Sequence, residues 1–401
     1  MVLSSVRLAI SETKSGQPLA IFFLLLLFFL SSAFSIFLAQ VGYFGALMVW
    51  CYCLFRKGPC IVEGTGFGLF FGLYMAAELV ATLFAYNQAQ SLLYMQRRML
   101  LLPIAYLVLS NTSSRAVLIS LFSALILSAL SVALWGCRDL ALHFPEYFRF
   151  ERRMSEFQMY MTAGGMMMIS CLMLLPFVLH KRTPSRIRWL ASFILIPLGV
   201  NLLFTFTRSS WLGFIAGAVV IGVRRHKIVA LPVIAAVGLV LLFASPEILD
   251  RMTSTFDPSH ENNQTRLHMW RTGMRMFADH PVVGIGDIGT EQLWDRYGEP
   301  PWPPEGHLHN NLIMWLVTLG ALGFCVLVGL FVRIWLRLWR IENSLKDDWL
   351  LGSLALGSLG VMAGFHINGL FEWNFGDAEI IMLVWGIVGL TLAAEKIGRK
   401  S

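Results

Sequence analysis

Long apolar runs recur along almost the whole sequence. Each extends for about 20 residues, the length of helix that crosses the roughly 30 Å hydrocarbon core of a membrane. Hydrophobic residues make up 57% and charged residues 14% of the chain, whereas a soluble domain carries about 25% charged residues. Within hydrocarbon, a helix satisfies its own backbone hydrogen bonds. The sequence therefore predicts an all-α polytopic membrane protein.

The polar breaks between these runs predict about 12 transmembrane helices. The predicted spans are 19–38, 41–55, 67–86, 99–110, 115–136, 159–180, 187–206, 210–224, 228–246, 310–338, 349–371 and 376–395. We expect a single integral membrane domain over residues 1–401. One large extramembrane loop, 247–309, should lie over it as a lid.

Basic residues predict the orientation. With both termini in the cytoplasm, most basic residues fall in inner loops, which the positive-inside rule favours. The same rule accounts for the net charge of +7 without nucleic-acid binding. All lysines lie in the inner set, and the outer set contains only arginines: Arg97, Arg98, Arg138, Arg149, Arg152, Arg153, Arg208, Arg251, Arg266, Arg271, Arg275 and Arg296.

An outer face restricted to arginine suggests phosphate handling, because guanidinium grips phosphate bidentately and ammonium does not. The alternative is that positive charge is simply scarce outside. One outer segment, 138–158, interleaves Arg149, Arg152 and Arg153 with aromatic residues. This composition suits a helix at the headgroups, and we predict that the three arginines bind substrate.

The six cysteines are scattered, mostly in or beside apolar runs. Their spacing indicates neither a zinc site nor a disulfide framework. We expect no bound metal and no cofactor.

Arg208 lies between two predicted spans, at the outer mouth of a tight helical hairpin. An arginine at this depth is costly unless it faces protein, water or an anion, so it is a candidate functional residue. The alternative is an arginine whose charged end reaches lipid headgroups.

In the large loop, Asn262 or Asn263 can cap a predicted helix over 264–278. One face of this helix gathers apolar side chains: Leu267, Trp270, Met274 and Phe277. Arg266 lies at the edge of that face and should point into a cavity, whereas Arg271 and Arg275 should point away. The following Gly284-Ile285-Gly286-Asp287-Ile288-Gly289 matches GxGxxG but follows no βαβ strand, so it indicates a turn rather than a dinucleotide site.

His309 opens a predicted span, where unpaired helix amides favour an anion and a neutral imidazole. It is a candidate general base for a hydroxyl, and the alternative is a helix cap or interface anchor. Acidic residues near the last span, including Glu372, Asp377 and Glu379, should pair with the arginines and hold them in place.

Three elements resemble those of O-antigen ligases: His309-Asn310-x9-Gly320-x2-Gly323, Thr205-Phe206-Thr207-Arg208-Ser209-Ser210, and Arg266-x3-Trp270 followed by His280-Pro281-x2-Gly284-Ile285-Gly286. Their order and the predicted spans also resemble that superfamily, which includes polymerases and other oligosaccharide transferases. The resemblance implies a GT-C-like membrane glycosyltransferase of the bacterial inner membrane. Its active site would face the periplasm.

The resemblance implies that Arg208, Arg266 and His309 are catalytic, and Trp270 and Asn310 of the same motifs are predicted to bind substrate. The donor would be an undecaprenyl-diphosphate-linked glycan, the acceptor the lipid A core, and membrane lipids would surround the protein. We expect inverting, metal-independent transfer, in which arginines replace the metal cation. A polymerase and, with less support, a transporter are the alternatives; a transporter would place ionisable residues near the midplane.

Overall fold

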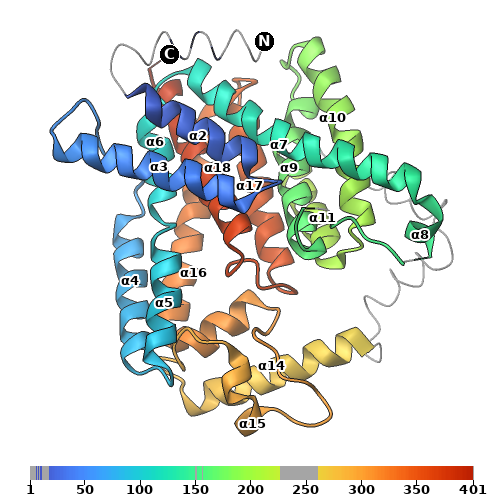
Figure 1. The fold of residues 1–401 in the computed structure, drawn as a ribbon. Coiled ribbons are helices and arrows are strands. Elements are labelled where there is room, and N and C mark those ends of the chain that lie inside the picture. The colour runs from blue at the N-terminus through green and yellow to red at the C-terminus, as the bar shows by residue number, and fades with distance from the viewer. Residues whose placement is uncertain are drawn as a thin grey trace.

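The computed structural model describes residues 18–149, 151–155, 157–225 and 261–400, together with Val6, Leu8 and Ile10. Its long helices form a bundle, and shorter elements cross one end of it (Figure 1). The bundle helices are α2 (Leu19–Ser31), α3 (Ile36–Phe55), α4 (Gly68–Leu83), α5 (Gln88–Met99), α6 (Pro103–Asn111), α7 (Arg115–Leu142), α9 (Tyr160–Leu179), α10 (Ser185–Phe204), α11 (Arg208–Arg225), α16 (Asn311–Leu345), α17 (Leu351–Asn368) and α18 (Ala378–Gly398). The predicted span 228–246 lies outside the described residues.

Eight helices in the described part of the chain are long and apolar enough to cross a membrane. They are α3, α5 joined to α6 as Gln88–Asn111, α7, α9, α10, α16, α17 and α18. Two shorter helices, α2 and α4, are also apolar. The chain is therefore an all-helical polytopic membrane protein, as the sequence predicts.

The first two predicted spans had incorrect boundaries. The chain turns after Ser31, and the side chain of Ser35 accepts a hydrogen bond from the amide of Leu38 to cap α3. Since a capping serine provides a helix start, α3 begins five residues before the predicted span at 41 and incorporates the end of the predicted first span.

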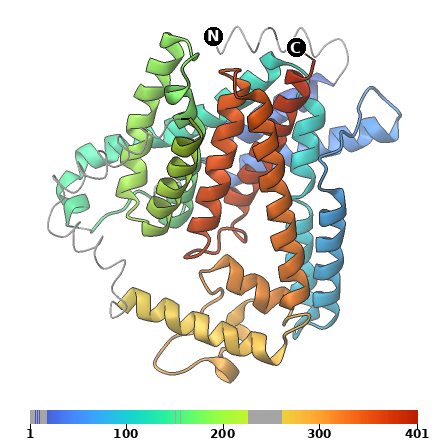
Figure 2. The ribbon, with the colours of Figure 1, turned by 180° about the vertical axis from the view of Figure 1, so that it is seen from behind.

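Residues 261–308, here called the lid segment, cross the end of the bundle opposite the C-terminal end of α18 (Figures 1 and 2). The segment contains α14 (Glu261–Asp279), the short helix η2 (Thr290–Leu293) and α15 (Trp294–Tyr297). It has a small apolar core of its own, which includes Met276, Ile285 and Trp294 and extends onto Met314 and Val317 of α16. The lid segment is thus packed onto the first turns of α16.

The glycine turn of the lid segment, residues 284–289, packs against α16 where that helix is kinked at Gly320. At Gly320, φ is +62°. Backbone hydrogen bonds to the lid segment replace some of those that a regular helix would form on either side of Gly320. The amides of Ile285 and Gly286 donate to the carbonyls of Val317 and Thr318 (2.9 and 3.1 Å). In return, the amides of Ala321 and Leu322 donate to the carbonyls of Pro281 and Val282 (2.8 and 3.2 Å).

Only glycines fit at this crossing. A Cβ on Gly320 would lie 2.3 Å from the backbone of Val282, and one on Gly284 would lie 2.5 Å from that of Thr318. Gly284 and Gly286 also have positive φ, which favours glycine. The prediction of a glycine turn is confirmed, and the turn binds the backbone of α16.

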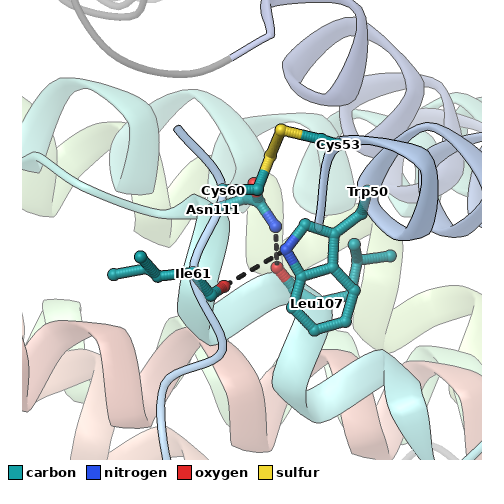
Figure 3. The surroundings of a disulfide bond; sticks show 6 residues. All are labelled: Trp50, Cys53, Cys60, Ile61, Leu107 and Asn111. Atoms are coloured by element: carbon teal, nitrogen blue, oxygen red, sulfur yellow. Dashed lines mark hydrogen bonds between the residues drawn. A yellow bond between two sulfur atoms is a disulfide. The ribbon is translucent and has the colours of Figure 1, made fainter. Parts of the chain in front are cut away.

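Cys53 and Cys60 form a disulfide, a pairing that was not expected from the sequence, which indicated no disulfide framework (Figure 3). The chain reverses after α3 through Lys57, whose φ is +50°, and this brings the two Cα atoms to 5.8 Å. Trp50 packs beside the pair and donates from Nε1 to the carbonyl of Ile61 (3.2 Å). Spacing along the sequence did not reveal this tight reversal.

Candidate functional site

A cavity of about 320 Å³ lies between the lid segment and the bundle. Its lining residues come from the 151–155 segment, α9, the turn before α11, α11, α14 and the stretch before α16: Arg153, Tyr160, Met161, Phe206, Thr207, Arg208, Ser209, Thr265, Arg266, Met269, Glu305 and His309. The structure thus brings Arg208, Arg266 and His309 together, although they are far apart in sequence. Their grouping is the central observation about the site.

Arg208 is the first residue of α11, and α10 ends four residues earlier at Phe204. Nη2 of Arg208 donates to Oδ1 of Asn263 in α14 (3.2 Å). Thr207 is tied to α9, because its hydroxyl donates to the carbonyl of Tyr160 (3.0 Å). The predicted helical hairpin is present, and it delivers both the guanidinium and a helix N-terminus to the cavity. Both favour a bound anion.

Arg266 projects from α14 into the same cavity. Burial lowers the pKa of Arg266 and the nearby Glu372 carboxylate opposes this shift, but a guanidinium remains charged in a protein. Arg271 and Arg275 are exposed, as predicted. Arg275 forms an ion pair with Glu299.

Two details of α14 differ from the prediction. The helix begins by Glu261, so Asn263 lies inside it and is not its cap. Its buried face carries Met269, Thr272, Gly273 and Met276, whereas Met274 is 42% exposed. Methionines occur on opposite sides of this helix, and the small residues Thr272 and Gly273 allow close packing on one of them. Of the predicted apolar face, Trp270 and Phe277 pack against the core of the lid segment, but Met274 does not, so the prediction was correct only in part.

His309 lies two residues before α16, with φ +46°, and its ring is held by Glu372. Nδ1 of His309 lies 2.8 Å from Oε1 of Glu372, in the connection between α17 and α18. Burial opposes ionisation of Glu372, but the hydrogen bond and the charges of His309 and Arg266 outweigh it and lower the pKa of Glu372. The carboxylate therefore fixes the ring tautomer, with hydrogen on Nδ1 and Nε2 able to accept a proton.

The prediction that Glu372 pairs with an arginine was wrong, since its ion pair is with His309. Asp377 does not pair with an arginine either: it caps α18 and accepts a hydrogen bond from the hydroxyl of Thr162 (2.6 Å). His307 packs edge-on against His309 with ring centres 4.2 Å apart. Burial and the charge of His309 lower the pKa of His307, which favours its neutral form.

The three arginines of the 138–158 segment that were predicted to bind substrate, Arg149, Arg152 and Arg153, have different surroundings. Arg153 lines the cavity and stacks on the Tyr160 ring at 4.6 Å. Arg152 instead forms two hydrogen bonds of 2.7 Å with the carboxylate of Asp139. Arg149 is exposed and is not among the cavity residues. Of the three predicted substrate-binding arginines, Arg153 alone lines this cavity.

Trp270 and Asn310 contact the backbone around His309. Nε1 of Trp270 donates to the carbonyl of Leu308 (3.1 Å). Asn310 caps α16 through a bond from the amide of Ile313 (3.1 Å), and its Nδ2 donates to the carbonyl of Leu370 (2.8 Å). These contacts fit residues that position His309, although both were predicted to bind substrate.

Arg98, one of the arginines of the predicted outer set, has its guanidinium fully engaged with other side chains of the protein. It lies between Glu78 (3.2 Å) and Asp287 of the glycine turn, which is also within ion-pair distance. Its guanidinium stacks on Trp373 at 5.3 Å. Arg98 therefore links the lid segment to α4 and to the connection that carries Glu372.

Several cavity residues were given no role from the sequence: Tyr160, Thr265, Glu305 and Ser209, although Ser209 belongs to the motif that contains Arg208. Ser209 and Thr265 are adjacent to Arg208 and Arg266, a signal that could have drawn attention to them. Oγ of Ser209 is buried and has no hydrogen-bond partner in the described structure. Among the described residues, no three His, Cys, Asp or Glu side chains gather in a way that could hold a metal ion.

Residues 190–328 match the family model described as O-antigen ligase. The matched stretch includes Arg208, Arg266, His309 and the Gly320 kink, so it supports the resemblance to the O-antigen ligase superfamily that the motifs indicate. No curated protein sequence matches the chain.

Proposed function

We propose, from the similarity of residues 190–328 to O-antigen ligases, that this membrane protein is a lipopolysaccharide O-antigen ligase. It would transfer a glycan from undecaprenyl diphosphate to the lipid A core. The observation that carries the proposal is the single cavity lined by Arg208, Arg266 and His309. Two arginines that would bind a diphosphate and a histidine that would deprotonate a hydroxyl thus line the same cavity.

In this mechanism His309 activates the acceptor. Nε2 accepts the proton of the acceptor hydroxyl as its oxygen attacks the anomeric carbon of the donor sugar. Glu372 stabilises the imidazolium that forms, through its bond to Nδ1. Because one hydroxyl displaces the leaving group directly, the anomeric configuration is inverted.

The bond between the anomeric carbon and the diphosphate oxygen breaks, and its electron pair leaves with undecaprenyl diphosphate. Arg208 and Arg266 are placed to stabilise the negative charge that develops. Arg153, the N-terminus of α11 and the unpaired hydroxyl of Ser209 add donors to the same cavity. These groups support a metal-independent reaction, since the guanidinium charges can take the place of a cation.

We assign the protein to the bacterial inner membrane, with the lid segment and cavity on the periplasmic side and both termini in the cytoplasm. The distribution of arginine and lysine supports this orientation. Labelling of single cysteines introduced at 265–305 with a membrane-impermeant reagent tests it. Protection of all these positions in intact spheroplasts would reverse the assignment.

The decisive experiment is transfer with purified protein, a defined undecaprenyl diphosphate glycan and lipid A core. We expect glycosylated core of inverted configuration, with activity retained in a chelator. A strict requirement for added magnesium or manganese would overturn the proposed role of the arginines. His309→Ala should lose transfer while still binding donor, and near-normal turnover would show that His309 is only a helix anchor.

An O-antigen polymerase is the second candidate, because the matched superfamily elements do not separate the two activities. A polymerase would use a second lipid-linked glycan as acceptor and would lengthen it. In a deletion strain, bare core together with polymerised glycan on its carrier supports a ligase. Unpolymerised single repeats on the core would instead indicate a polymerase.

A further inference from the structure

Four buried polar side chains form a continuous hydrogen-bonded chain, here called the asparagine relay. Nδ2 of Asn311 donates to Oδ1 of Asn374 (2.6 Å), and Nδ2 of Asn374 donates to Oδ1 of Asn368 (2.7 Å). Nδ2 of Asn368 then donates to Oγ of Ser210 (3.1 Å). The relay joins the start of α16, the α17–α18 connection, the end of α17 and the first turn of α11.

The relay has a regular relation to the candidate active site. Asn311 follows His309 by two residues, Asn374 follows Glu372 by two, and Ser210 follows Arg208 by two. Asn368 joins Asn374 to Ser210. Three functional side chains on separate elements are thus each anchored, two positions further on, to one hydrogen-bonded unit.

Further bonds attach the relay to the backbone at its centre. Oδ1 of Asn311 accepts from the amide of Phe375 (3.2 Å), and Nδ2 of Asn374 also donates to the carbonyl of Phe365 (2.8 Å). The amide of Asn311 donates to the carbonyl of Gly369 (2.7 Å). Since unpaired amides are costly when buried, these bonds favour one arrangement of α16 against the α17–α18 connection.

Close packing of α11 against α17 brings Ser210 to the relay. A Cβ on Gly213 would lie 2.7 Å from the carbonyl oxygen of Gly364, and one on Gly217 would lie 2.5 Å from that of Gly360. Small residues four positions apart let two membrane helices approach this closely. Residues at the ends of the two helices can therefore share a short hydrogen bond.

We propose that the asparagine relay sets the positions of His309, Glu372 and Arg208 relative to one another, so that Asn311, Asn374, Asn368 and Ser210 are positioning residues. This inference rests on the proposed transfer reaction. Arg266 lies on α14, outside the relay, so the relay fixes the bundle side of the cavity. Loss of the relay should then lower kcat more than it raises KM, because the reacting groups lose alignment.

Ser210→Ala is the smallest test, because it removes only the oxygen at the end of the relay. Ser358→Ala is its matched control: Ser358 is also buried and bonds across two helices to Thr391, but lies outside the relay and the cavity lining. Both variants should show similar changes in melting temperature. We expect kcat to fall about tenfold in Ser210→Ala and less than about twofold in Ser358→Ala.

A second pair separates the hydrogen bonds from packing. Asn368→Leu removes both relay bonds at nearly constant size, whereas Asn368→Asp can accept from Asn374 and pair with the Ser210 hydroxyl. Asn368→Asp should therefore recover part of the kcat lost in Asn368→Leu. Equal loss in the two variants would contradict the proposal.

Hydrogen exchange gives a readout that does not require transfer activity. In Ser210→Ala, peptides covering 307–313 and 369–376 should exchange faster than in Ser358→Ala. Identical exchange and identical kcat in these two variants would overturn the relay. Absence of transfer in the wild-type protein would instead overturn the proposed function, and the exchange comparison would still decide the relay.

Discussion

Nδ1 of His309 lies 2.8 Å from Oε1 of Glu372, although 63 residues separate them in the sequence. The imidazole therefore has a fixed orientation before any substrate arrives. A carboxylate behind a histidine also stabilises the imidazolium that forms when the ring accepts a proton.

Glu372→Gln should lower kcat about 100-fold while donor binding is retained, because an amide preserves the shape but not the charge. Steady-state transfer assays and donor binding measure the two effects. Glu291→Gln is the control, since Glu291 is an exposed acid of the lid segment. Equal activity in both variants would contradict the role of Glu372.

The carboxylate of Glu372 should also make the folded protein less stable at acidic pH. The pKa of Glu372 is lowered from 4.5 in the folded protein, so its stabilising contribution is present above that value and is lost as pH falls through the lower one. The melting temperature of the wild type should fall more steeply than that of Glu372→Gln below about pH 4.5. Parallel curves would show that the interaction contributes little.

Arg266→Lys should reduce kcat/KM about 100-fold, because an ammonium cannot provide the two parallel bonds of a guanidinium to a diphosphate. Arg271→Lys, an exposed change on the same helix, is the control and should remain near wild type. Transfer assays over a range of donor concentrations make the comparison. A fully active Arg266→Lys would leave only a general electrostatic role for this side chain.

Arg153 and Arg152 are adjacent, but their substitution should have different effects. Arg153→Ala should raise KM for the donor about tenfold, because the side chain lines the cavity. Arg152→Ala should lower the melting temperature by about 2–4 °C with little change in KM, because Arg152 holds the carboxylate of Asp139. The reverse pattern in kinetics and calorimetry would exchange the two roles.

The sequence allowed the membrane class, the α10–α11 hairpin and the grouping of Arg208, Arg266 and His309 to be predicted, because these depend on apolar length and on motifs. It did not allow the full buried face of α14, the partner of Glu372 or the role of Arg152 to be predicted. Each of these depends on which surfaces meet after the helices pack. The close packing at Gly273 produces no periodic pattern in the sequence. The pairing of His309 with Glu372, 63 residues further along the chain, produces none either.

Docking of the lid segment should depend on pH through Asp287. Burial raises the pKa of Asp287 from 3.8 to about 7; Arg98 opposes this shift and Glu78 adds to it. Because the folded pKa is the higher one, the stabilising contribution is fully present at low pH and is lost as pH rises through about 7.

Asp287→Asn imitates the protonated side chain and should flatten this dependence. Hydrogen exchange of residues 281–290 measures docking between about pH 6 and about pH 8. Asp295→Asn, an exposed change in α15, should behave as wild type. A pH response that persists in Asp287→Asn would assign it to another group.

The Cys53–Cys60 pair offers a test of orientation. Glu63, three residues beyond Cys60, lies 3.5 Å from Lys396 near the end of α18, a region that the proposed orientation places in the cytoplasm. Thiols there are kept reduced, so the proposed orientation predicts, against the disulfide seen in the structure, that both cysteines react with maleimide when cells are lysed in denaturant. Comparison with the Cys53→Ser variant identifies the gel band in which Cys53 carries maleimide. A bond that persists in cells would invert the proposed topology.

The exchange of backbone bonds at Gly320 has a consequence for biogenesis. Residues 281–286 leave the ribosome before α16 does, yet their bonding partners are Val317, Thr318, Ala321 and Leu322. The lid segment cannot reach its final arrangement until α16 has been synthesised and inserted. Nascent chains that end before residue 317 should thus expose the glycine turn to proteases, and chains that extend through α16 should protect it.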